Sequence, residues 1–285
     1  MSRPPIRTGD GRTGPGRHRR HRFAVVGAAA ALVALVLAGC SDPRPSTSRG
    51  GVEAPPITAL SGPGPVYVSV GASETAGIGA DQPLREGWPR VLFRTALPPT
   101  TSFVNMGIPG ATVAQAIREE LPMAVALRPS LTTVWLNVND ILAGVTVDRF
   151  AREMDTLLRG LRRDGATRVL VANVAPLDRL PSYLACRPSP PAGSAPCRLP
   201  VTPPGPDAVN ALIDDFNDAT RRLVERHGAH LVDLHALGTA ARAAGGDAAL
   251  VSDDGFHPST AGHAAVAGAF ADVLRSTGPL GPPTG

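Results

Sequence analysis

From residue 66 onward, short apolar runs alternate with segments in which apolar residues recur at helical spacing. The apolar runs, rich in β-branched residues, predict strands over 66–70, 101–105, 131–137, 167–173 and 230–234. The helical periodicity predicts helices over 111–127, with an interruption at Pro122, and over 150–161, 209–216 and 261–275. This alternation is typical of a parallel sheet covered on both faces. Because sites in such sheets gather beyond the carboxyl ends of the strands, we expect the functional residues to follow the strands.

The first 40 residues have the pattern of an export signal. An arginine-rich start ends at Arg22, and an apolar run over 23–39 leads to Cys40. The apolar run is short for a transmembrane span. Residues 37–40 (Leu-Ala-Gly-Cys) resemble the bacterial lipobox, in which cleavage precedes the cysteine and a diacylglycerol is attached to its sulfur. We therefore expect an exported protein, lipid-anchored through Cys40 to the outer face of the cytoplasmic membrane or secreted. An uncleaved anchor, or an ordinary signal with an incidental cysteine, stays open.

Two composition changes divide the rest of the chain. Residues 41–64 are rich in serine, proline and glycine, which predicts a tether. Residues 65–285 are then left as one domain, which we expect to be monomeric. Within it, the proline-rich segment 177–206 contains Cys186 and Cys197, and an exported domain favours a disulfide between them. Two free thiols or half of a metal site are the alternatives. Since the segment follows a strand, we expect it to border the active site.

The charge distribution argues against nucleic-acid binding. The formal net charge is +4, but seven arginines and one aspartate in residues 1–39 give +6 there and leave −2 for the remainder. The basic residues therefore belong to the leader, and a nucleic-acid surface loses its electrostatic support. The sequence contains no lysine, which excludes Schiff-base chemistry and a P-loop.

Polar residues that can perform acyl chemistry follow the predicted strands. They lie in four clusters, at 71–77, 105–112, 137–140 and 254–258. Ser73 follows the first strand, and a serine hydroxyl needs a base to become a nucleophile. His257 is the natural base, and Asp254, three residues earlier, can hold its imidazole in one tautomer. The backbone N–H of Gly107 and the side-chain amide of Asn139 can bind a developing oxyanion.

The four clusters, in this order, resemble the SGNH/GDSL serine hydrolases, a family named for the Ser, Gly, Asn and His of its sequence blocks. The resemblance implies a flavodoxin-like three-layer α/β/α sandwich with a parallel sheet of about five strands. It also implies cleavage of carboxylic esters, either small esters or acylated envelope components, without a metal or an organic cofactor. It assigns Ser73 as nucleophile, Ser73 N–H, Gly107 and Asn139 as the oxyanion hole, and His257 with Asp254 as the base and its partner.

Two positions depart from the family pattern. Ala72 stands where the family usually has aspartate, and Asn137 stands where its third block usually begins with glycine. Neither change removes a group from the mechanism, so we expect an active enzyme. Asp253 competes with Asp254 as the partner of the histidine. An acyltransferase with the same site and a non-catalytic envelope-binding lipoprotein are the alternative functions.

We expect structural roles for the other histidines and the two tryptophans. His227, His230 and His235 match no metal-ligand spacing, and we expect no metal site. We expect His263 to face outward on the last helix or to pair locally. Trp88 and Trp135 are interpreted as core residues.

Overall fold

The computed structural model describes residues 64–197 and 202–280. The signal peptide expected over 1–40, with Cys40, and the tether expected over 41–64 lie outside the described residues, apart from the last residue of the tether. Among the helices in the described ranges, none is long and apolar enough to cross a membrane.

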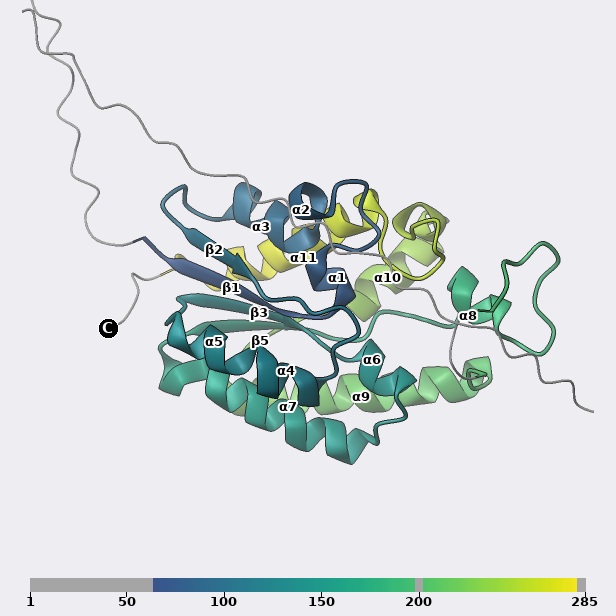
Figure 1. Ribbon diagram of the computed structural model, residues 1–285, viewed down its shortest axis with the longest axis horizontal. Coiled ribbons are helices and arrows are strands. Elements are labelled where there is room, and N and C mark those ends of the chain that lie inside the picture. Colours follow the sequence, from purple (N-terminus) through teal and green to yellow (C-terminus); the bar gives the residue numbers. More distant parts are fainter. Residues whose placement is uncertain (1–63, 198–201, 281–285) are drawn as a thin grey trace, which may run out of the picture. The chain divides into compact units, whose positions relative to one another are not determined.

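The core of the described domain is a five-stranded sheet in which every pairing is parallel. Its strands are β1 (Val66–Gly71), β2 (Ser102–Asn105), β3 (Leu131–Trp135), β4 (Arg168–Ala172) and β5 (His230–Val232), in the spatial order β2-β1-β3-β4-β5 (Figure 1). The five-stranded parallel sheet expected from the sequence is therefore confirmed. The chain passes from β1 to β2 on one side of β1, and then returns to β3 on the other side of β1. Loops that leave β1 and β3 diverge at such a point and open a crevice at the carboxyl edge of the sheet.

Helices cover both faces of the sheet and make the fold three-layered (Figure 1). One face is covered by α4 (Val113–Glu119), α5 (Leu121–Ala126), α7 (Val147–Arg162) and α9 (Pro206–His227). The other face is covered by α3 (Trp88–Ala96), α10 (Leu234–Ala243) and α11 (Thr260–Ser276). Trp88 is fully buried against Phe270 in the second layer. The predicted α/β sandwich is confirmed.

Short elements lie at the ends of the strands and bear on function. They are α1 (Ser73–Ala76), α2 (Pro83–Glu86), α6 (Val138–Leu142), α8 (Pro181–Ala185) and two 3₁₀ turns, Arg163–Gly165 and Asp247–Leu250. The helix predicted over 111–127 is two helices, α4 and α5, divided at Glu120. The break confirms the interruption expected at Pro122, whose ring disfavours a continuous helix.

The proline-rich segment 177–206 contains α8 and a disulfide between Cys186 and Cys197, as expected from the sequence. The segment lies against the loop that carries Asp254 and His257, because the N–H of Ser182 donates to the carbonyl of Gly255 at 3.1 Å.

Candidate active site

Ser73 is the first residue of α1, two residues beyond the end of β1. Its side chain is largely buried, and its hydroxyl donates to Oε2 of Glu74 at 3.3 Å. Among the described residues, Ser73 and His257 share no direct hydrogen bond. The serine is therefore presented at the carboxyl edge of the sheet, with its hydroxyl turned toward a neighbouring carboxyl group.

Asp254 and His257 form a close pair in the loop that precedes α11. His257 Nδ1 lies 2.5 Å from Asp254 Oδ2, while Asp254 Oδ1 accepts the backbone N–H groups of Phe256 and His257 and the hydroxyl of Ser252. Partial burial acts to raise the pKa of Asp254, but these hydrogen bonds, above all the one from His257, hold it well below its usual value. An ionised Asp254 keeps the proton on Nδ1 and leaves Nε2 as the basic nitrogen. Asp254 makes this contact, and its neighbour Asp253 does not.

The segment after Ser73 packs directly against the histidine loop. Gly79 has a φ of +98°, and a Cβ there would lie 2.2 Å from the carbonyl oxygen of Pro258 and 2.8 Å from Cβ of His257. His263 of α11 fixes the same segment, since its Nδ1 accepts the N–H of Trp88 and its Nε2 lies 3.0 Å from the carbonyl oxygen of Ile78. The expectation that His263 faces outward is wrong: it is fully buried, and its ring nitrogens contact backbone groups of the loop after α1 and of the first residue of α3.

Gly107 packs closely against α1. A Cβ at this position would lie 2.6 Å from the backbone nitrogen of Ala76, so close approach requires the glycine here. Its N–H donates to Oδ1 of Asn105 at 3.0 Å. Asn105 also accepts the Ser69 hydroxyl and donates to the carbonyl of Thr75 at 2.7 Å. Asn105 thus connects β1, α1 and the Gly107 loop. In the sequence, only its position two residues before Gly107 indicates this role.

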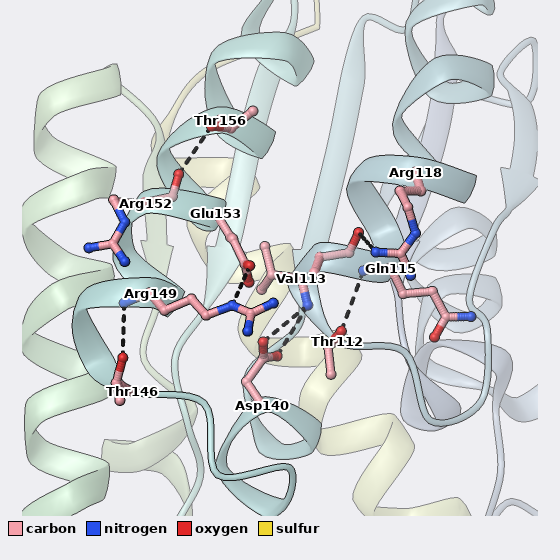
Figure 2. A network of polar contacts seen from close by, with 11 residues as sticks. Thr112, Val113, Gln115, Arg118, Asp140, Thr146, Arg149, Arg152, Glu153 and Thr156 are labelled. Carbon is pink, nitrogen blue, oxygen red and sulfur yellow. Dashed lines mark hydrogen bonds and ion pairs between the residues drawn. The ribbon is translucent and has the colours of Figure 1, made fainter.

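Asn139 is held between the end of β3 and the start of α4. Its Nδ2 donates one hydrogen to the carbonyl of Ala111 at 3.1 Å, which leaves the second amide hydrogen for another acceptor. Figure 2 shows the neighbouring Asp140 carboxylate pointing at the first turn of α4, where it accepts the N–H of Val113 at 3.2 and 3.3 Å. Burial raises the pKa of Asp140 to about 6, and the Val113 hydrogen bond opposes that rise. The α6 turn that carries Asn139 is therefore anchored.

The two departures from the family pattern have structural consequences. Ala72 is buried and offers no polar group to the turn before Ser73. A carboxyl group still binds this turn, because Oε2 of Glu120 accepts the N–H of Gly71 at 2.8 Å. Asn137 is buried, and its Nδ2 donates to the carbonyl of Ala172 at 3.3 Å, which links the ends of β3 and β4.

Replacing Glu120 with glutamine is expected to reduce the loss of stability that occurs as the pH rises from 4.5 to about 8. Burial raises the pKa of Glu120 from 4.5 to about 8, although the Gly71 hydrogen bond lowers it in part. The folded state therefore keeps this proton to a higher pH than the unfolded chain does. As a result, the free energy of unfolding falls as the pH rises from 4.5 to about 8. A tenfold change in acidity corresponds to about 1.4 kcal/mol, so the loss amounts to several kcal/mol.

Urea unfolding at about pH 5 and about pH 9 measures this loss. Glutamine keeps an oxygen for the Gly71 N–H and cannot ionise, so Glu120→Gln should lose less stability than the wild type between the two pH values. Glu225→Gln, at an exposed position of α9, should behave as the wild type. Equal losses in Glu120→Gln and the wild type would contradict the prediction.

A cavity of about 500 Å³ lies beside the histidine loop. Its wall is mainly apolar and includes Trp135, Pro176, Leu180, Leu237, Ala241 and Val266. Gly255, which follows Asp254, and Pro258, which follows His257, also line it. Trp135 contributes in addition to a small recess shared with Glu74 and Asn139. The cavity has the size and polarity of a small-molecule site, and its wall begins at residues next to the candidate acid–base pair.

Residues 69–265 match the family model of the GDSL-like Lipase/Acylhydrolase family. The chain belongs to this family. It is a serine ester hydrolase, as the sequence predicts. No curated protein sequence matches the chain.

Several solved structures share the fold of this GDSL-like hydrolase. The psychrotrophic esterase EstA from Pseudoalteromonas sp., inhibited by monoethylphosphonate, has 16% identity and a TM-score of 0.54, over 75% of this chain and 98% of its own. The lipase/acylhydrolase from Enterococcus faecalis has 17% identity and a TM-score of 0.57, over 78% of this chain and 100% of its own. LAE5, an α/β hydrolase enzyme from the metagenome of Lake Arreo, has 22% identity and a TM-score of 0.52, over 76% of this chain and 97% of its own. At these identities the likeness establishes the fold.

Proposed function

We propose that the protein is an exported esterase in which Ser73 attacks a carboxylic ester and His257, held by Asp254, acts as the base. The observation that carries the proposal is the 2.5 Å contact between Asp254 and His257 in a loop packed against the segment that follows Ser73. The substrate is a small ester or an acylated component of the cell envelope. The described groups suffice for the reaction.

The first step is acylation of the serine. The Ser73 hydroxyl turns from Glu74 to Nε2 of His257, and its proton moves to that nitrogen as Oγ bonds to the carbonyl carbon. The carbonyl π electrons move to the oxygen. The N–H of Ser73 and the second amide hydrogen of Asn139 then donate hydrogen bonds to this oxyanion. Gly107 joins as a donor when its N–H leaves the Asn105 oxygen.

The second half of the cycle releases both products. The protonated His257 gives its proton to the departing alcohol oxygen as the carbonyl reforms, which leaves an acyl group on Ser73. Water then gives a proton to the same nitrogen as its oxygen bonds to the acyl carbon. The bond from that carbon to Oγ breaks as His257 returns the proton to Oγ, which releases the carboxylic acid and regenerates the serine. Each step uses the same base, and no other proton acceptor is required.

Labelling with a fluorophosphonate tests the nucleophile directly, and the Pseudoalteromonas esterase is a relative of the same fold that a phosphonate inhibits. The full chain in detergent is treated with the probe and digested, and the adduct is located by mass spectrometry. The proposal requires one adduct, on Ser73, that is absent from Ser73→Ala and present in Ser194→Ala, a control at an exposed serine of the 177–206 segment. A folded wild type without an adduct would refute it and favour a binding lipoprotein.

We further propose that the enzyme is anchored through a lipid on Cys40, on the basis of the arginine-rich start, the apolar run and the Leu-Ala-Gly-Cys sequence. Acyl chains contribute about 0.8 kcal/mol per buried methylene, enough for stable anchoring when several chains are attached. Cells grown with tritiated palmitate should label the wild type and leave Cys40→Ser unlabelled. Equal label in both proteins would exclude Cys40 as the anchor.

The cavity beside the histidine loop is expected to receive the apolar part of the ester. Ala241→Trp fills part of this cavity from α10. The substitution should lower kcat/KM for a p-nitrophenyl decanoate by at least about tenfold, because each methylene kept out of the cavity loses about 0.8 kcal/mol. The value for the acetate ester should change much less. Ala240→Trp, on the exposed side of the same helix, is the matched control. If Ala241→Trp lowered kcat/KM equally for both esters, the cavity would not be the site of the acyl chain.

A further inference from the structure

Glu74 is a buried acid that the mechanism above does not use. It is the second residue of α1, the residue is 7% exposed, and its Oε2 accepts the Ser73 hydroxyl at 3.3 Å. It also lines the small recess that contains Asn139 and Trp135. A titratable group therefore touches the proposed nucleophile and shares a recess with a proposed oxyanion donor.

The contact creates a competition for one hydrogen. Ser73 has a single hydroxyl hydrogen, and a hydrogen given to Glu74 is withheld from Nε2 of His257. Hydrogen bonds to an ionised acceptor are about twice as strong as those between neutral groups. An ionised Glu74 therefore opposes removal of the proton by His257.

A neutral Glu74 has the opposite effect. A protonated carboxyl group gains an O–H donor, which can be directed at the Ser73 oxygen, so the serine hydrogen is free to turn to His257. The neutral form also avoids placing a negative charge in the recess where the substrate oxyanion is proposed to form. Buried carboxylic acids held neutral at neutral pH serve as hydrogen-bond donors in other enzyme sites.

The surroundings of Glu74 favour the neutral form. Burial raises the pKa of Glu74, while its own backbone N–H, the facing His257 and the Ser73 hydroxyl offset part of that rise. Asp254, behind His257, adds to the rise. The charged and titratable groups that face Glu74 are thus the acid–base pair itself, both from the loop before α11.

We propose that Glu74 is a further catalytic residue that works as a neutral carboxyl group: protonated, it donates to the Ser73 oxygen and leaves the hydroxyl hydrogen to His257, and ionised, it retains that hydrogen and turns the site off. The proposal rests on the assignment of Ser73 as the nucleophile. No bond to Glu74 forms or breaks in the cycle, and its proton stays on the carboxyl group throughout.

The pH dependence of kcat/KM on a short p-nitrophenyl ester tests the role. The wild-type value should fall with rising pH as Glu74 ionises. Glu74→Gln should lose this fall, because the amide donates a hydrogen and cannot ionise. Its maximum should stay within about tenfold of the wild type, the range that one neutral hydrogen bond supports. Glu74→Met, also uncharged but without a donor, should likewise lose the fall and have a lower maximum; it serves if the glutamine variant does not fold.

Glu120→Gln is the matched control, because Glu120 is also a buried acid, with a pKa of about 8, and binds the turn before Ser73. The fall should persist in this variant. A fall that persists in Glu74→Gln, or that is lost only in Glu120→Gln, overturns the proposal, as does a wild-type profile without a fall. These results differ from a failure of the proposed function itself, in which the wild type hydrolyses no ester and Ser73 takes no phosphonate label.

Discussion

His257→Ala should lower kcat by about 10⁶-fold, a loss as large as that expected from removing the whole acid–base–nucleophile set. The reason is that one nitrogen, Nε2, is proposed to accept and return every proton in the cycle. Asp254 cannot replace it, since its oxygens are engaged with the imidazole, two backbone N–H groups and the Ser252 hydroxyl. Stopped assays with a sensitive fluorogenic ester measure the residual rate.

A second histidine supplies the control for this measurement. His227 lies on α9, and its Nε2 is 2.9 Å from Asp155 on α7. His227→Ala should reduce stability somewhat, because it removes a partly buried contact, while the folded variant keeps kcat within about tenfold of the wild type. A similar loss in both variants would mean that His257 is not the base.

The sheet could be predicted closely because its strands are buried on both faces and read as apolar runs. The differences lie at strand ends. The run 131–137 continues beyond β3, since Leu136 and Asn137 are also buried although they belong to the loop. The fifth strand ends at Val232, because the Asp233 side chain caps α10 by accepting the N–H of Ala236.

Two helices of the second layer were not predicted, and their sequences explain why. The α10 sequence, LHALGTAARA, has four alanines and one glycine in ten residues, so its buried and exposed positions differ little in polarity. The α3 sequence is only nine residues long, and Gly87 before it provides no side-chain cap. In both cases the helix is stabilised by packing against the sheet and α11, which a local pattern does not express.

The candidate site shows the same division between local and distant contacts. The Asp254–His257 contact spans three residues, so spacing alone could suggest it. Glu120 is 49 positions from Gly71 in the sequence, and no periodic pattern predicts a contact between them. Glu74 is adjacent to Ser73 in sequence. From the sequence alone, an acidic residue at this position is expected to be exposed to solvent, whereas the fold buries it. Burial of acids, which sets their charge, is therefore the part of this site that the sequence could not supply.

Asp254→Asn should lower kcat by about 10⁴-fold without unfolding the loop. Asparagine can keep an oxygen in the position of Oδ1, where it accepts the N–H groups of Phe256 and His257, and can place its NH₂ where Oδ2 now meets Nδ1. The NH₂ group then donates to Nδ1, so the imidazole carries its hydrogen on Nε2 and can no longer accept the serine proton.

The same enzyme assay, with urea unfolding as a check on folding, separates this effect from a loss of structure. Asp253→Asn changes the exposed neighbouring carboxylate, which lines the cavity but does not contact the imidazole, and should lower kcat by less than about tenfold. A folded Asp254→Asn with near wild-type kcat would show that the imidazole does not need this partner. Because the structure gives Asp254 both the loop contacts and the imidazole contact, the asparagine variant isolates the second of these two roles, and its residual rate measures how much of catalysis depends on the tautomer of one ring.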